Sequence, residues 1–309
     1  MTFLETSETR PEIGVLTQYE PGIAMILAPN ASPMTWWGTN TWLIGTERLA
    51  IIDPGPQDTS HLKAILAGIS GRPVDYILVT HAHVDHSPLA KALSRETGAP
   101  ILAFGSASAG QEPHMKALAD TGLAGGGEGV DTDFAPDRTL GDGDCIEVSG
   151  RRLQAIHTPG HMSNHLCFAW DTPGKTPALF SGDHVMGWAS SLVSPPDGDL
   201  TAFMSSCQKL ARRKDRIYYP GHGAPITDPA ARLAWLISHR RSRESQITEL
   251  LQEGSQSAHS LTSRIYTDVK PALLPAAERN VLAHLIDLSQ RNIAAPLGKL
   301  SADVRFELC

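Results

Sequence analysis

The segment "THAHVDH" places three histidines and one aspartate within residues 80–86, and side chains of both types bind metal ions. Imidazole nitrogen and carboxylate oxygen are suitable ligands for Zn²⁺, and a catalytic zinc keeps a position open for water. The segment follows a predicted strand, so alternate residues point the same way. His81 and His83 are therefore expected to reach one ion, while Asp85 and His86 turn toward a neighbouring point. A lone histidine is usually structural, but this density of ligand types favours a metal site.

Three further ligand candidates lie on turns later in the chain. They are His161 in "HTPGHMSNH", Asp183 in "LFSGDH" and His222 in "YYPGHG". Each follows or ends a predicted strand, and the neighbouring glycines permit the backbone bends that bring such loops together. We therefore expect all of these side chains to converge around two adjacent metal ions.

The elements that must position these residues alternate between short apolar strands and amphipathic helices. Strands are predicted at "TWLIG", "LAIIDPG", "VDYILVT", "PILAF", "CIEVSG", "RLQAIHT", "LCFAW", "ALFSGD" and "RIYYPG". Apolar residues at helical spacing predict helices over residues 58–71, 87–98 and 200–213, the second with Ser87 as its N-cap. Residues 105–137 are rich in glycine and indicate an irregular insertion with one short helix around Met115 to Asp120.

From Asp228 onward the helical patterns become longer. One helix is predicted from Asp228 to Gly254, two more in "LTSRIYTDVK" and "LPAAERNVLAHLIDLSQ", and a strand pair in "IAAPLGKLSADVRFELC". This change predicts a catalytic domain over residues 1–228 and a small C-terminal domain over residues 229–309.

Composition excludes several classes of protein. The chain has 309 residues, 41% hydrophobic and 19% charged content and a formal net charge of -7, as expected for a globular protein without a bulk attraction to nucleic acid. The first thirty residues lack a cationic start with a long apolar run, and no stretch of about 18 apolar residues occurs. The 4 cysteines are scattered, without paired metal-binding spacing. We therefore expect a cytoplasmic protein with no membrane span.

The order Thr-His-x-His-x-Asp-His, then His161, Asp183 and His222, resembles the metallo-β-lactamase superfamily of hydrolases over roughly residues 20 to 228. The aspartate in "SGD" is similar to the glyoxalase II type, because zinc β-lactamases place a cysteine ligand in the later part of the site. The resemblance implies an αββα sandwich, in which two mixed β-sheets are flanked by helices and the metals lie at one edge. It further implies that His81, His83 and His161 hold the first metal, that Asp85, His86 and His222 hold the second, and that Asp183 bridges both.

Such a site would carry out hydrolysis. Two cations about 3.5–4 Å apart lower the pKa of a shared water toward neutrality, and the resulting bridging hydroxide attacks a polarised carbonyl or phosphorus. Zinc is the expected metal, with iron or manganese as alternatives. Asp85 is a candidate for handling a proton, although as a metal ligand it is a weaker base than the hydroxide is a nucleophile.

The C-terminal segments "HRRSRESQITELL", "SRIYTDV" and "AAERNVLAHLIDL" are similar to the winged-helix-like module of the lactamase-beta-2-like proteins, whose animal members are associated with cleavage of single-stranded RNA. Three functions therefore stay open. We favour hydrolysis of an ester, thioester or related bond in a small molecule, because the chain is acidic overall. An endoribonuclease is the alternative, and a nucleic-acid-binding regulator without catalysis is disfavoured by the complete ligand set. The oligomeric state is open, a homodimer included.

Other candidates lie around the expected ligands. Trp36 and Trp37 in "MTWWGTNTW" are candidates for a substrate wall or a base-stacking surface. The alternative is that both side chains pack between elements of the fold. His184 is a further candidate for lining the pocket. Asp53 and His165 are candidates for orienting the ligands through hydrogen bonds, with a turn-forming role as the alternative for Asp53.

Overall fold

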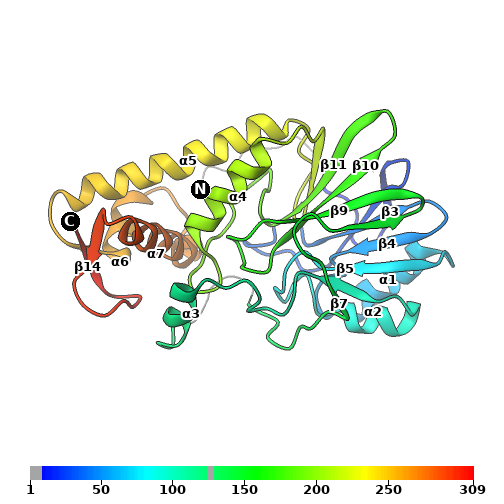
Figure 1. Ribbon diagram of the computed structural model, residues 1–309, viewed down its shortest axis with the longest axis horizontal. Coiled ribbons are helices and arrows are strands. Elements are labelled where there is room, and N and C mark those ends of the chain that lie inside the picture. The colour runs from blue at the N-terminus through cyan, green and yellow to red at the C-terminus, as the bar shows by residue number, and fades with distance from the viewer. Residues whose placement is uncertain (1–8, 124–128) are drawn as a thin grey trace.

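Two β-sheets pack face to face and carry helices on their outer faces (Figure 1) in the computed structural model, which describes residues 9–123 and 129–309. The first sheet has the order β1-β2-β3-β4-β5-β6-β7, with bounds Thr17–Glu20, Ile23–Leu27, Asn40–Gly45, Leu49–Ile52, Val74–Leu78, Ile101–Ala103 and Arg138–Thr139. The second has the order β12-β11-β10-β9-β8, with bounds Ile217–Pro220, Lys175–Gly182, Leu166–Thr172, Arg151–His157 and Cys145–Val148.

Both sheets are mixed, as predicted. Strands β4 to β7 pair in parallel, and so do β11 and β12, while the other neighbours are antiparallel. Parallel neighbours need a crossover, and the helices α1 (Thr59–Ile69) and α2 (Ala90–Thr97) provide it between β4, β5 and β6. Because parallel strands end at the same sheet edge, the loops that follow them collect there.

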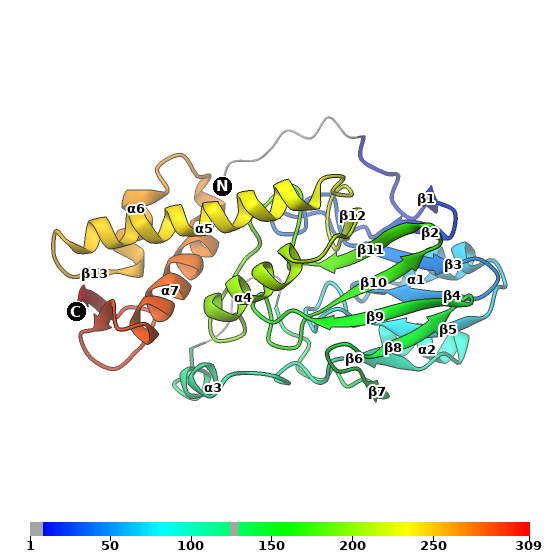
Figure 2. The ribbon, with the colours of Figure 1, turned by 45° about the horizontal axis from the view of Figure 1, so that its top comes forward.

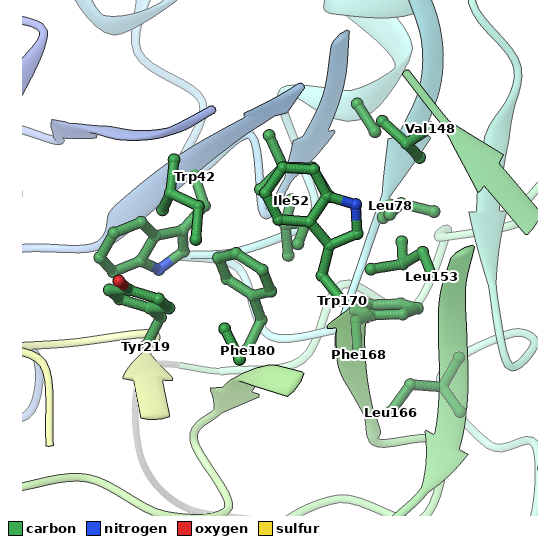
Figure 3. Close-up of a cluster of buried hydrophobic side chains, with 14 of the residues drawn as sticks. Trp42, Ile52, Leu78, Val148, Leu153, Leu166, Phe168, Trp170, Phe180 and Tyr219 are labelled. Atoms are coloured by element: carbon green, nitrogen blue, oxygen red, sulfur yellow. The ribbon is translucent and has the colours of Figure 1, made fainter. Parts of the chain in front are cut away.

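Aromatic side chains from both sheets fill the space between them. Trp42 of the first sheet meets Phe180 of the second edge to face, with ring centroids 5.8 Å apart, and Tyr219 at 4.8 Å. Figure 3 shows these rings beside Trp170 and Phe168, all of them at most 1% exposed. Burial of such large apolar groups drives the association of the two sheets.

Helices cover both outer faces, which confirms the αββα arrangement. Ile65 of α1 and Leu93 of α2 pack on the first sheet. The helix α4 (Leu200–Ala211) and the start of α5 (Pro229–Leu251) pack on the second. The N-cap of α5 is Asp228, whose side chain accepts a hydrogen bond from the Ala231 N–H, and Pro229 follows it, as the sequence pattern predicted.

The C-terminal part has its own apolar core. It contains α6 (Ala258–Ile265), a 3₁₀ turn (Pro271–Leu273), α7 (Leu274–Gln290) and a sheet of the order β13-β15-β14, with bounds Gln256–Ser257, Arg305–Leu308 and Ala294–Pro296. The helix α3 (Pro113–Ala119) of the insertion joins this core through Met115 and Leu118. Figure 2 shows α5 running from the two-sheet part to these helices. Since α5 contributes to both cores, the domain boundary at residue 228 stays a prediction.

Some elements differ from the sequence analysis. Helix α2 begins at Ala90 with Leu89 as its N-cap residue and has no side-chain cap, so the predicted cap Ser87 lies before the helix, where its hydroxyl donates to the Asp131 carboxylate at 2.7 Å. The sequence analysis did not identify β1 and β2. The predicted irregular insertion includes residues 124–128, which lie outside the described residues. Within residues 9–123 and 129–309, no helix has the length and apolar character needed to cross a bilayer.

Candidate metal centre

The ligand candidates follow the ends of four strands and meet at one edge of the two sheets. His81 and His83 follow β5, His161 follows β9, Asp183 follows β11 and His222 follows β12. An isolated antiparallel β-bridge joins the backbone of Thr39, which precedes β3 of the first sheet, to that of His222. All seven residues are buried, with at most 6% of their surface exposed. The fold therefore brings together every residue that the sequence predicted for the metal site.

The first group of nitrogen atoms belongs to His81, His83 and His161. The Nδ1 atom of His83 lies 3.0 Å from Nε2 of His81 and 3.1 Å from Nε2 of His161. Their ligand atoms form a set that can hold one metal ion.

The second group contains Asp85, His86 and His222. Oδ2 of Asp85 lies 3.3 Å from Nε2 of His86 and 3.1 Å from Nε2 of His222, and these two nitrogens are 3.3 Å apart. Thr39 donates a hydrogen bond to the same carboxylate oxygen at 3.3 Å. These contacts are consistent with Asp85 as a metal ligand. The transfer of a proton by Asp85 stays a prediction.

Asp183 lies between the two groups. Its Oδ1 is 3.5 Å from Nε2 of His86, while Oδ2 is 3.7 Å from Nε2 of His161 and 3.2 Å from Nε2 of His222. Oδ1 has no hydrogen-bond partner among the described residues. A buried carboxylate oxygen without a donor is costly unless a cation occupies the space that it faces.

The outer ring nitrogens of four histidines are held by the protein. The Nδ1 acceptors are Thr80 Oγ1 for His81 (2.9 Å), Asp53 Oδ2 for His86 (2.9 Å), the Leu192 carbonyl for His161 (2.7 Å) and the Gly38 carbonyl for His222 (3.0 Å). Carbonyl and carboxylate oxygens only accept, and the Thr80 hydroxyl already donates to Asp53, so the ring nitrogens donate. In the neutral imidazoles, Nε2 then presents a lone pair to the centre of the site.

This arrangement fits divalent cations. In the first group, inward lone pairs 3.0–3.1 Å apart repel one another unless a positive charge lies between them. Two nitrogens bonded at 2.0–2.1 Å to one tetrahedral zinc are about 3.3 Å apart, close to the separations seen here. An N–H donated to a carboxylate or carbonyl is also the usual support of a metal-binding histidine.

Charge in the site favours cations as well. Burial alone would raise the pKa of Asp85, but His86 and His222 outweigh it and hold the pKa below its usual value. Burial alone would lower the pKa of His222, but Asp183 and Asp85 outweigh it and raise the pKa to about 10. Burial lowers the pKa of His83 to about 3. The carboxylates thus stay anionic and attract positive charge to the second group, while the first group presents neutral imidazoles.

Asp53 was predicted either to orient the ligands through hydrogen bonds or to form a turn. Its carboxylate accepts hydrogen bonds from the Thr80 N–H at 2.7 Å, the Thr80 hydroxyl at 2.8 Å and His86 Nδ1 at 2.9 Å. It therefore orients His86 directly, and His81 through Thr80. Asp53 also has a positive φ of 52°, so it forms the turn too.

Replacing Asp53 with alanine is expected to weaken zinc binding by about 10–100-fold, because His86 loses the acceptor that orients its ring. Zinc affinity would be measured by competition with a chromophoric chelator. Asp75→Ala is the matched control, since Asp75 forms an ion pair with Arg48 elsewhere on the first sheet. An unchanged zinc affinity in Asp53→Ala would contradict the assigned role.

His165 and His184 both lie in the interior. The backbone N–H of Asp183 donates to Nε2 of His165 at 3.2 Å, so His165 supports the bridging candidate. His184 is 0% exposed and contacts Phe203, with ring centroids 4.5 Å apart, and Cys207. Because the His184 side chain has no exposed surface, it cannot contact a substrate, and its predicted place in the lining of the pocket is wrong.

Trp36 and Trp37 lie in different surroundings. The ring of Trp36 stacks on that of Trp188, with centroids 5.2 Å apart and planes inclined by 18°. Trp37 packs against the core between the two sheets. Trp36 thus remains the stronger candidate for a substrate contact, while Trp37 has the packing role that the sequence left open.

The sequence analysis missed the residues that hold the loop after Asp183. From α5, Arg232 donates to the carbonyls of Met186 (2.7 Å) and Ala189 (2.6 Å), and Arg240 donates to those of Ser190 (2.7 Å) and Ser191 (2.6 Å). The amide oxygen of Asn280 on α7 accepts from the Val193 N–H at 3.1 Å and from Arg240 at 2.8 Å. The same loop carries the Leu192 carbonyl, so the C-terminal helices fix the acceptor of His161.

Gly221 permits a close approach of the backbone to two ligand candidates. A Cβ atom added there would lie 2.4 Å from Oδ1 of Asp183 and 2.8 Å from Cε1 of His86. Gly221→Ala is therefore expected to displace the Asp183 carboxylate and to lower zinc affinity by about tenfold or more, as loss of a supporting group does. Zinc content after dialysis would measure this. Gly141→Ala, where the nearest atom is 3.5 Å away, should retain its zinc, and equal retention in both variants would refute the steric argument.

Comparisons with known proteins agree with this geometry. The model of the metallo-beta-lactamase superfamily matches residues 34–222, and that of the beta-lactamase associated winged helix domain matches residues 257–302. The chain is 30% identical over 302 residues to an atrochrysone carboxyl ACP thioesterase of Passalora fulva, covering 96% of this chain and 82% of that protein. It is 29% identical over 309 residues to a beta-lactamase-like protein 2 homolog of Drosophila melanogaster, covering 95% and 96%.

A solved structure supports the fold along the whole chain. A beta-lactamase domain protein from Burkholderia ambifaria superposes with a TM-score of 0.77 at 20% sequence identity, covering 99% of this chain and 97% of that one. The matches to the two family models and the buried cluster of histidines and aspartates agree with one another. The chain belongs to the metallo-β-lactamase superfamily of hydrolases and carries a beta-lactamase associated winged helix domain in its C-terminal part.

Proposed function

We propose that the protein is a hydrolase with two zinc ions that cleaves an ester, thioester or related bond of a small-molecule substrate. One observation carries the proposal. Two groups of three ligand atoms face inward, with the Asp183 carboxylate between them. Among the bonds considered, a thioester is favoured by the name of the Passalora fulva relative, a carboxyl ACP thioesterase.

The residues of the chain provide a preorganised and buried site. Two divalent cations held there would lower the pKa of a coordinated water and polarise the bond under attack. The Gly38 and Leu192 carbonyls and the Asp53 carboxylate hold the imidazoles in one orientation before substrate arrives. Burial of the ligands limits contact with bulk water and strengthens electrostatic interactions within the site.

A panel of substrates tests the proposal. Protein freed of metal with a chelator and reloaded with zinc, iron or manganese would be assayed on N-acetylcysteamine thioesters, aryl esters, lactones and single-stranded RNA. We expect turnover of thioesters or esters that chelation abolishes and zinc restores. RNA cleavage with no thioester, ester or lactone turnover would favour the ribonuclease instead. A cytoplasmic location and a homodimer stay predictions.

A further inference from the structure

We propose that Asp131 is a positioning residue for His83, and that it supports zinc binding by the first group of ligands separately from the second. Asp131 lies in the part of the insertion that runs from residue 129 to residue 134, which we call the 129–134 segment. The inference rests on the zinc binding of the proposed function and deepens it, because it names what controls one of the two metal positions.

His83 differs from the other histidines of the site in the nitrogen that it presents. Its Nδ1 faces the centre, 3.0 Å from Nε2 of His81 and 3.1 Å from Nε2 of His161. Its Nε2 is then the outer nitrogen, and no hydrogen bond holds that atom within residues 9–123 and 129–309. The other four histidines are held at their outer nitrogens by oxygen atoms of the protein. The orientation of His83 therefore depends on its backbone and on packing.

The 129–134 segment holds that backbone. Val130 forms an isolated antiparallel β-bridge with His83. Two hydrogen bonds flank the bridge, since the Val84 N–H donates to the Gly129 carbonyl at 3.1 Å and the Asp131 N–H donates to the carbonyl of residue 82 at 2.8 Å. The backbone on both sides of His83 is thus tied to the insertion.

The Asp131 side chain adds a second tie on the other side of His83. Its carboxylate accepts a hydrogen bond from the Ser87 hydroxyl at 2.7 Å, and Ser87 is 1% exposed. The Ser87 N–H in turn donates to the His83 carbonyl at 3.1 Å. A hydrogen bond to a charged acceptor is stronger than one between neutral groups, so this contact is the strongest that joins the two segments.

Phe134 anchors the far end of the segment. It is 3% exposed and lies in the apolar cluster that contains Ala82 and Leu89. Its N–H donates to the Asp131 carbonyl at 3.1 Å, so both residues belong to one turn. Loss of the Asp131 carboxylate alone should therefore loosen the bridge to His83 without detaching the segment or unfolding the protein.

The second group is held by residues 38–55 and not by the 129–134 segment. Asp53 accepts from Nδ1 of His86, and the Gly55 N–H donates to the His86 carbonyl at 2.9 Å. The carbonyl that accepts from Nδ1 of His222 lies in the same stretch. A displacement at the bridge should therefore weaken zinc binding by the first group and leave the second group largely unchanged.

Two background variants separate the groups in an experiment. His222→Ala disables the second group and keeps the first, while His81→Ala does the opposite. Adding Asp131→Ala should lower zinc affinity by about tenfold in the His222→Ala protein and by no more than about twofold in the His81→Ala protein. Competition with a chromophoric chelator would measure both. An equal loss in the two backgrounds, or no loss in the His222→Ala protein, would overturn the proposal.

Matched variants test the hydrogen bond itself in the His222→Ala background. Asp131→Asn keeps an acceptor oxygen for Ser87 and should restore most of the zinc affinity. Ser87→Ala should lower the affinity as much as Asp131→Ala does, and the two together should cost no more than either alone, because both remove the same bond. Asp133→Ala, which removes an exposed carboxylate from the same segment, should have no effect. A loss that persists in Asp131→Asn, or losses that add, would contradict the assigned role.

Folding and turnover are followed on the same proteins. Circular dichroism of the metal-free variants checks the fold, and if Asp131→Ala does not fold, Ser87→Ala carries the test from the other side of the bond. A selective loss of zinc from the first group in a protein that hydrolyses no thioester, ester or lactone would support the role of Asp131 and contradict the proposed function. Thioester turnover together with an equal loss of zinc in both backgrounds would do the reverse.

Discussion

Replacing His81 with alanine is expected to abolish hydrolysis and to leave the first group of ligands unable to retain a metal ion. His81 provides the nitrogen that faces both His83 and Asp183, and it is completely buried. Loss of a group that merely supports a ligand costs about 10–100-fold in metal affinity or activity, so loss of a ligand itself should exceed 100-fold. Thioester turnover and metal content by mass spectrometry would be measured on the same preparation.

A histidine outside the site is the control for this substitution. The His259 side chain is 77% exposed and lies within hydrogen-bond distance of Glu278 on the C-terminal helices, so His259→Ala removes the same chemical group without touching the centre. It should retain its full metal content and activity. Full activity in metal-free His81→Ala protein would refute the role of metal in the reaction.

Replacing Arg240 with methionine should lower the free energy of unfolding by about 3–5 kcal/mol, because buried acceptors lose charged donors. The Arg240 side chain donates to the carbonyls of Ser190 and Ser191 and to the Asn280 amide oxygen, and is 3% exposed. Burial lowers its pKa to about 10, so it still carries its charge at neutral pH. Urea unfolding monitored by circular dichroism would measure the loss.

The same substitution should loosen the metal centre. Ser191 precedes Leu192, whose carbonyl orients His161, so a displaced loop weakens zinc binding as well as stability. Arg241→Met is the matched control, because Arg241 is exposed on the same helix, and its effect should stay within about 0.5 kcal/mol. An Arg240→Met protein that unfolds at the same urea concentration as the parent would refute this account of the loop.

Residue type, order and position relative to strand ends were enough to predict the ligand candidates. Histidine and aspartate bind metals through their own side chains, and strand ends bring distant loops to one edge. His81 and His222 are thus identified by local pattern although 141 positions separate them. The helix that begins after Asp228 was predictable for a similar reason, because an Asp-Pro start acts within one turn.

Backbone partners and packing neighbours were decided by the tertiary structure alone. The carbonyls of Gly38 and Leu192 orient two histidines, yet every residue has a carbonyl, so no residue type marks them. The short apolar strand "IAMIL" of β2 carries no period that separates a strand from a buried helix segment. Ser87 had the features of a cap, but the chain turns after it, with the Ala90 N–H donating to the Ser87 carbonyl at 2.9 Å, and α2 begins only at Ala90.

Residues that act across the two cores depend in the same way on long-range contacts. Arg240 lies in "HRRSR", a cluster that from sequence alone fits either a solvated helix face or an interface with the catalytic domain, and the packing of α5 on both cores turns this residue inward. Trp188 and Trp235 join Trp36 only after the sheets and α5 have assembled. The amino-acid sequence determined which atoms can bind metal and the order of the elements that present them. The tertiary structure decided which atoms orient those ligands and which side chains line the pockets, because both depend on contacts between segments far apart in the chain.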